Sequence, residues 1–155
     1  MKGSINMNRQ QKYPDTNTFH YHNANPKNKI TADCVIRAIC TALNEPYETV
    51  YKELFEFSLK CGYMLTDKNC YDKYLKSKGW VKHNQPRKED NSKYTGKEFC
   101  SRAQEYTFNY PSKIFAHIGG HHVVAIVDGV INDIWDSSDG CIGNFYIKND
   151  EHCII

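Results

Sequence analysis

The fold is decided by ITADCVIRAICTAL, residues 30–43. This stretch predicts a helix that is apolar on more than one face, as in a helix buried in a core. Asp33 is of a type that caps helix N-termini, and Asn44 followed by Pro46 predicts the end of the helix. Cys34 therefore falls at the first helical position, where unpaired N–H groups and the helix dipole stabilise a thiolate.

Further helices are expected after this one. A helix that follows Pro46 and ends at Gly62 is predicted by apolar residues spaced near the 3.6-residue period. These apolar residues are Val50, Tyr51, Leu54, Phe55 and Leu59. Another helix is expected to start after Asp67, and a capping-box spacing predicts one more across 96–105.

The pattern changes after Pro111, where short apolar strands replace helices. KIFAHI, residues 113–118, predicts a strand. Residues 121–135 read HHVVAIV, then Asp-Gly, then VINDIW, which is the pattern of a β-hairpin with a tight turn. NFYIK, residues 144–148, predicts a last strand. Because helices come first and antiparallel strands second, the expected class is α+β.

Length and composition indicate one domain. The chain has 155 residues, of which 40% are hydrophobic and 13% aromatic, enough for a core of its own. Residues 1–18 are polar and aperiodic, so we expect a flexible N-terminal arm followed by one domain over 19–155. The net charge of +2 gives no electrostatic reason to expect nucleic acid or an anionic membrane as a partner.

The cysteines and the apolar segments indicate a cytoplasmic protein. Seven cysteines are an odd number, and neither a secretory signal nor a run of about 18 apolar residues is visible. A reducing compartment is therefore expected rather than a disulfide scaffold. No pair has CxxC spacing, so a zinc ribbon is not predicted, and we expect no metal or other cofactor.

Two adjacent histidines open the predicted hairpin, in GGHHVVAIVDG, residues 119–129. An imidazole at the start of a buried strand is held rigidly, which suits a general base. A zinc site is the weaker interpretation, because adjacent strand residues point to opposite faces and make His121 and His122 poor joint ligands.

Two aspartates on the return strand, in DIWDSSDG at residues 133–140, can orient such an imidazole. With a regular tight turn, Asp133 shares the face of His122 and Asp136 does not. A one-residue bulge would instead place Asp136 directly opposite His122. Arg37, one turn after the cysteine, can also pair with an aspartate.

The order of cysteine on a helix, histidine on a strand and aspartate on the next strand resembles the papain-like cysteine peptidase superfamily. The likeness is closest to its compact bacterial and phage-encoded members and covers about 28–44 and 111–148. It implies a papain-like fold, in which the nucleophile helix packs on a C-terminal antiparallel sheet. The context of Cys34 departs from the Gly-Cys-Trp type of true papains, with Ala-Asp before it and Val after it, so the resemblance does not extend to papain's substrate preferences.

The resemblance also implies roles for particular residues. Cys34 would be the nucleophile and His122 the general base, since the histidine of the superfamily opens a strand. The orienting residue ends the return strand before a small polar residue, which favours Asp136 with Asp133 as runner-up. Asn28 lies six residues before the cysteine, where the superfamily places its oxyanion donor.

The implied function is a cysteine hydrolase that cleaves a peptide, isopeptide or related amide bond through a thioester. The same residues serve acyl transfer. The expected substrate is a peptide or protein, in the cytoplasm of a bacterium or of a phage-infected cell. The alternative is a non-catalytic phage or bacterial protein that binds or inhibits a partner through the same fold. Thiol reactivity separates the two, because only a catalytic cysteine has a stabilised thiolate.

Overall fold

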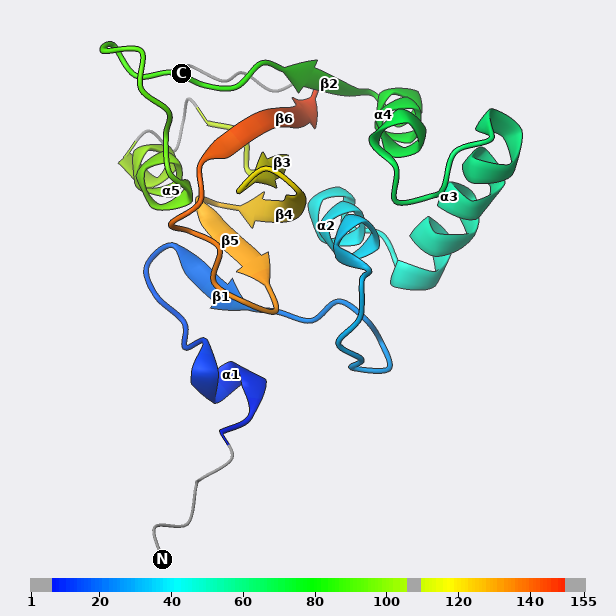
Figure 1. Cartoon of the computed structure of the whole chain (residues 1–155), viewed down its shortest axis with the longest axis horizontal. Coiled ribbons are helices and arrows are strands. Elements are labelled where there is room, and N and C mark those ends of the chain that lie inside the picture. The colour runs from blue at the N-terminus through cyan, green and yellow to red at the C-terminus, as the bar shows by residue number, and fades with distance from the viewer. Residues whose placement is uncertain (1–6, 106–109, 150–155) are drawn as a thin grey trace, which may run out of the picture.

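The computed structural model describes residues 7–105 and 110–149, which form a six-stranded sheet with helices on both faces (Figure 1). The helices are α1 (Arg9–Lys12), α2 (Cys34–Leu43), α3 (Tyr47–Cys61), α4 (Lys68–Ser77) and α5 (Gly96–Glu105). The strands are β1 (Phe19–Tyr21), β2 (Trp80–His83), β3 (Lys113–Ile118), β4 (His122–Val127), β5 (Val130–Asp133) and β6 (Ile142–Lys148). The α+β class is confirmed.

The sheet is mixed rather than purely antiparallel. Its strand order is β1-β5-β4-β3-β6-β2, with β1 parallel to β5 and the other neighbours antiparallel. The C-terminal strands β3 to β6 make up its centre, as the sequence predicts, and β1 and β2 add the two edges. The sequence does not predict β2, because four residues are too few for an alternating pattern to stand out.

β4 and β5 form a tight hairpin through Asp128 and Gly129. Both turn residues have positive φ, 49° and 73°, as a type I′ turn requires, and glycine adopts this conformation without steric cost. The pairing is regular away from the turn, and Ala125 lies opposite Asn132. Within the paired residues that the structure describes, the hairpin has no bulge, so side chains alternate between the two faces throughout.

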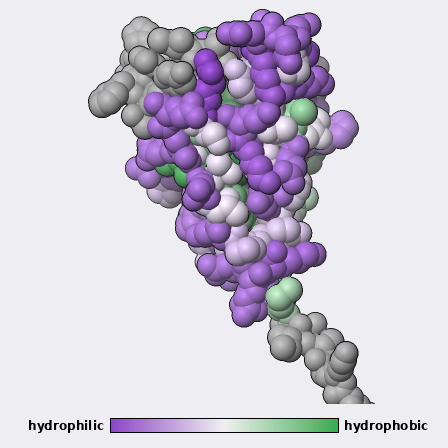
Figure 2. All heavy atoms as spheres, turned by 90° about the vertical axis from the view of Figure 1, so that its left-hand side faces the viewer, coloured by the Kyte–Doolittle hydropathy of each residue, from purple (hydrophilic) through white to green (hydrophobic). Residues whose placement is uncertain are grey.

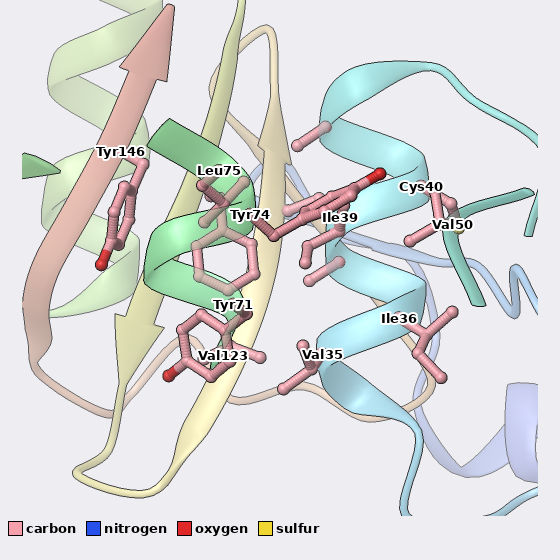
Figure 3. Close-up of a cluster of buried hydrophobic side chains, with 14 of the residues drawn as sticks. Val35, Ile36, Ile39, Cys40, Val50, Tyr71, Tyr74, Leu75, Val123 and Tyr146 are labelled. Carbon is pink, nitrogen blue, oxygen red and sulfur yellow. The ribbon is translucent and has the colours of Figure 1, made fainter. Parts of the chain in front are cut away.

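α2 is the central helix of the molecule. It lies against β4, with α3 on its other side, while α4 lies between α3 and β2 (Figure 1). Figure 3 shows its apolar side chains gathered with those of α4 and the sheet in one buried cluster, which includes Val35, Ile39, Tyr74 and Leu75. Fully burying one such side chain contributes about 1.5–3 kcal/mol, so this packing fixes the position of the first residue of α2.

α5 covers the opposite face of the sheet. Its side chains Phe99, Cys100 and Ala103 are buried there in a second cluster with residues of β3 to β6. The chain therefore has three layers, with the sheet between α5 and the group of α2, α3 and α4 (Figure 1). The surface on the α5 side is largely hydrophilic, as Figure 2 shows.

α3 buries less of its apolar surface than its sequence pattern suggests. Val50 and Leu54 are fully buried, whereas Tyr51, Phe55 and Leu59 are 45%, 49% and 70% exposed. The reason is that α3 lies outside α2 and α4 and contacts them along one stripe only (Figure 1). The remaining apolar residues lie one position further round the helix and face outward.

Residues 1–18, predicted to be a flexible arm, contain α1 in their described part. A capping box between Asn8 and Gln11 closes this short helix. Arg9 then donates from Nε to the backbone oxygen of Ile134, at 2.6 Å. Residues 7–18 thus dock beside the end of β5, and residues 1–6 lie outside the described part.

Candidate functional site

Cys34 is the first residue of α2, as the sequence predicts. Asp33 holds the N-cap position, but its side chain makes no capping hydrogen bond. Its carboxylate instead pairs with Arg37 and accepts a hydrogen bond of 2.7 Å from the hydroxyl of Tyr47. The first N–H groups of α2 therefore stay uncapped by Asp33, next to the Cys34 thiol.

The surroundings of Cys34 favour a thiolate. Burial raises the pKa of the thiol, but hydrogen bonds from the imidazole of His122 and the backbone N–H of Val123 act against it. The positive charge of Arg37 acts in the same direction, and the pKa of Cys34 ends below its ordinary value. A helix N-terminus beside the sulfur adds to this stabilisation.

His122 is held between Cys34 and Asp133. Its Nε2 lies 2.5 Å from Oδ2 of Asp133, which leaves Nδ1 for the sulfur. Burial lowers the pKa of the imidazole, yet the Asp133 carboxylate and Cys34 outweigh burial and raise the pKa to about 9. The ring of Trp135 packs against the imidazole at a centroid distance of 4.9 Å. This arrangement favours an imidazolium beside a thiolate.

Asp133, and not Asp136, contacts His122, so the preference for Asp136 is corrected. That preference requires a bulge in the hairpin, whereas the register of β4 and β5 is regular. Continued by one residue, this register puts Asp133 opposite Val124, diagonal to His122 on the same face. Asp136 lies in the following loop, where its Oδ1 accepts a hydrogen bond of 3.0 Å from the backbone N–H of Ser138.

Arg37 ties the two aspartates of the site together. Its Nη2 lies 3.2 Å from Oδ1 of Asp133, and its Nη1 pairs with Asp33. The backbone N–H of Ile134 donates to the same Oδ1 at 2.8 Å, so both oxygens of the Asp133 carboxylate have partners. The sequence predicts only that Arg37 can pair with an aspartate. The feature that marks Arg37 in the sequence is a charge inside the otherwise apolar run CVIRAIC.

Asn28 lies on the exposed loop before α2, in the left-handed conformation with φ of 51°. Its Oδ1 accepts a hydrogen bond of 3.3 Å from Asn23. Within the part of the chain that the structure describes, no hydrogen bond joins Asn28 to Cys34. Its role as an oxyanion donor stays a prediction. The neighbouring Asn25 donates to Asp33 at 3.0 Å and so belongs to the buried polar network.

The other buried cysteines differ from Cys34 in their chemistry. Burial raises the pKa of the Cys40 thiol, and it raises those of Cys70 and Cys100 to about 11 and about 12. Cys141 is exposed on the surface, and Cys153 lies outside the described residues. Cys34 is therefore distinguished from Cys40, Cys70 and Cys100 by the imidazole of His122, which lowers its pKa, and by being only partly buried.

Among residues 7–105 and 110–149, no group of three or more His, Cys, Asp or Glu side chains is arranged to hold a metal ion. None of the helices in these two ranges is long and apolar enough to cross a membrane. Comparisons of the chain with models of protein families, with curated proteins and with solved structures give no match.

Proposed function

We propose that this chain is a papain-like cysteine hydrolase that cleaves a peptide, isopeptide or related amide bond. One observation carries the proposal: a cysteine at a helix N-terminus has its pKa lowered by a neighbouring imidazole, and a buried carboxylate holds Nε2 of that imidazole. Each part has a known use in nucleophilic catalysis, and the three correspond in type to a nucleophile, a base and an orienting group.

The proposed reaction has two steps. The Cys34 thiolate attacks the carbonyl carbon, an S–C bond forms, and the oxyanion is stabilised by the N–H groups at the start of α2 and by the side-chain amide of Asn28. The C–N bond then breaks as His122 gives its Nδ1 proton to the leaving amine. Water attacks the thioester, His122 accepts a proton from it, and the carboxylic acid leaves as the thiolate is restored. An amine in place of water gives acyl transfer.

The buried charges support these roles. An imidazolium with a pKa near 9 is available as the proton donor at neutral pH. Asp133 fixes the tautomer and the ring orientation through Nε2, and Arg37 fixes Asp133. Only Cys34 and His122 exchange protons or bonds with the substrate, so Asp133 and Arg37 are positioning residues.

Selective alkylation tests the proposal without knowledge of the substrate. Iodoacetamide at neutral pH should modify Cys34 much faster than the exposed Cys141, as mapped by mass spectrometry, because the thiolate is the reacting species. The His122→Ala variant should lose this selectivity, while Cys141 provides the internal control in every sample. Uniform slow labelling of both cysteines would reject the hydrolase and favour the non-catalytic binding protein.

Hydrolysis itself is tested on mixed libraries of fluorogenic peptide and isopeptide substrates. Any cleavage by the full chain should fall by several orders of magnitude in the Cys34→Ala variant, as is typical when a nucleophile is removed. The Cys40→Ala variant is the matched control, because Cys40 lies on the same helix with a raised pKa. Cleavage that survives in Cys34→Ala would show that another residue is the nucleophile.

A further inference from the structure

A cavity of about 880 Å³ is lined by Tyr71 and His121, whereas Cys34 and His122 themselves do not line it. It is bounded by the start of α4, by β2 and β6, and by the turn between β3 and β4. His121 lines this cavity, and the next residue along the chain is His122. We call this cavity the α4–β6 cleft. Its volume falls in the range of about 300–1,000 Å³ that is usual for ligand-binding clefts.

Tyr71 connects the cleft to the buried cluster against which the candidate nucleophile Cys34 packs. Its side chain lines the cleft and packs in the same buried cluster as Val123 and Cys34 (Figure 3). Burial raises the pKa of the Tyr71 phenol, and a negative charge on Cys34 raises it further. Its hydroxyl points away from α2 and lies 3.3 Å from Nε2 of His117.

The charge of the cleft is predominantly positive. Lys68, Lys82 and Lys93 line it, and none of the three forms an ion pair with any residue that the structure describes. The carboxylate among the lining residues is Asp72, which already pairs with Lys76 at 2.8 Å and accepts a hydrogen bond of 2.5 Å from Tyr146. Asp72 also interacts electrostatically with Lys82, but the three lysines of the lining outnumber this one carboxylate.

The pKa of the His117 imidazole is lowered by burial, and the positive charges of two of these lysines, Lys82 and Lys68, lower it further. These two lysines therefore act on one point of the cleft wall. A negatively charged group placed there would meet both cations at once, beside a neutral imidazole and the Tyr71 hydroxyl.

Two glycines form the turn at one end of the cleft. Gly119 and Gly120 have positive φ, 62° and 92°, a conformation that favours glycine. No atom lies within 4 Å of where a side chain at either position would begin, so the space beside the turn is open. The other lining groups include the side-chain amide of Asn69. The amides of Gln85 and Asn144 also line the cleft, but Gln85 donates to the backbone oxygen of Ile142 and Asn144 accepts from the backbone N–H of Gln85.

We propose that the α4–β6 cleft binds a peptide segment with acidic side chains, and that this segment is the part of the substrate next to the scissile bond. The second half of this statement rests on the proposed hydrolase function. The first half rests on the cleft alone. Lys68, Lys82 and Lys93 supply the attraction for Asp or Glu side chains, and the open space beside the glycine turn is where the main chain would lie.

The test compares two peptides of the same length with uncharged ends, acetyl-Gly-Glu-Gly-Glu-Gly-amide and acetyl-Gly-Gln-Gly-Gln-Gly-amide. Each is titrated into the full chain carrying Cys34→Ala, which removes turnover. Binding is followed by the amide NMR signals of Gly119, Gly120 and Gly143, all of which line the cleft. The glutamate peptide should shift these signals and bind more tightly than the glutamine peptide. Exposed ion pairs predict a difference of roughly two- to tenfold.

Charge variants connect this preference to the cleft. The double variant Lys68→Gln/Lys82→Gln should lose most of the preference for the glutamate peptide. The control Lys52→Gln/Lys60→Gln removes the same charge from the exposed side of α3 and should keep the preference. Raised salt should weaken binding of the glutamate peptide only, because free ions screen exposed charges.

The outcomes separate the two proposals. Equal affinity for both peptides, no shift of the three glycine signals, or a preference that survives in Lys68→Gln/Lys82→Gln would each overturn the acidic-peptide cleft. Slow, unselective alkylation of Cys34 would overturn the hydrolase instead. In that case, selective binding of the glutamate peptide would still identify the cleft as a binding site.

Discussion

Arg37 and Asp133 are in contact across 96 residues of sequence, with 3.2 Å between Nη2 and Oδ1. Both side chains are buried, at 5% and 3% exposure. The same guanidinium also pairs with Asp33, so two buried carboxylates share one permanent cation. The remaining negative charge favours a protonated imidazole at His122, whose Nε2 contacts the other oxygen of Asp133.

Removal of the Arg37 charge should strongly destabilise the fold. Arg37→Leu leaves the carboxylates of Asp33 and Asp133 buried without their cation, and breaking such a pair costs about 3–5 kcal/mol of unfolding free energy. Equilibrium urea unfolding measures the change. Lys97→Leu is the matched control, because its ion pair with Asp139 is exposed and should contribute little to stability. Equal losses in the two variants would contradict a special role for Arg37.

Asp133→Asn should slow the alkylation of Cys34. Loss of the carboxylate removes a main cause of the raised pKa of His122, so less imidazolium remains to stabilise the thiolate. At a pH below the pKa of Cys34, a rise of one unit in that pKa lowers the thiolate fraction about tenfold. We therefore expect the alkylation rate near pH 6 to fall by at least about tenfold. The measurement is the second-order rate constant with iodoacetamide.

Asp136→Asn is the control for this substitution, with the same chemical change three residues further on. Its carboxylate accepts a hydrogen bond within its own loop, so the alkylation rate should stay close to that of the unmodified chain. If Cys34 is alkylated slowly in Asp136→Asn but at the normal rate in Asp133→Asn, then Asp136, the residue favoured by the family resemblance, orients the histidine in solution.

The alkylation of Cys34 should persist to lower pH than that of an ordinary thiol. Burial raises the pKa of Cys34, but His122, Val123 and Arg37 together bring it below its usual range. The thiolate therefore remains at pH values where a reference thiol with a pKa of about 8.5 is protonated. The His122→Ala variant should move the pH profile of Cys34 upward. A profile unchanged by His122→Ala would show that the imidazole does not stabilise the thiolate.

In a Cys34→Ser variant, stability should fall as the pH rises toward 9. Burial lowers the pKa of His122, but Asp133 and Cys34 raise it to about 9, above the value of about 6.5 expected for the unfolded chain. A raised folded-state pKa contributes stability that is complete below about pH 6.5 and lost as the pH rises through the folded-state value. Serine does not titrate here, so the opposing contribution of the thiolate is absent.

Urea midpoints over this pH window measure the effect. Because serine also removes the part of the shift due to Cys34, the loss should be complete somewhat below pH 9. The double variant Cys34→Ser/His122→Gln should show no such fall, since no imidazole remains at the site. The same slope in both variants would assign the pH dependence to another group.

Much of the site could be predicted from local sequence. The apolar run of residues 30–43 determined the central helix and put Cys34 at its start, because helix period and end signals act over a few residues. The Asp128-Gly129 turn determined the hairpin and placed His122 at the start of its first strand. These elements carry their information within a single stretch of chain.

Tertiary structure alone decided which aspartate meets the histidine. The hairpin turn allowed a regular register or a bulged one, and packing of the sheet selected the regular one with Asp133 inward. The parallel pairing of β1 with β5 and the outward face of α3 were decided in the same way, by elements distant in sequence. Arg37 pairs with both Asp33 and Asp133 because α2 packs against β4 and β5. Contacts between residues so far apart in the chain produce no periodic pattern in the sequence, so the sequence does not predict them.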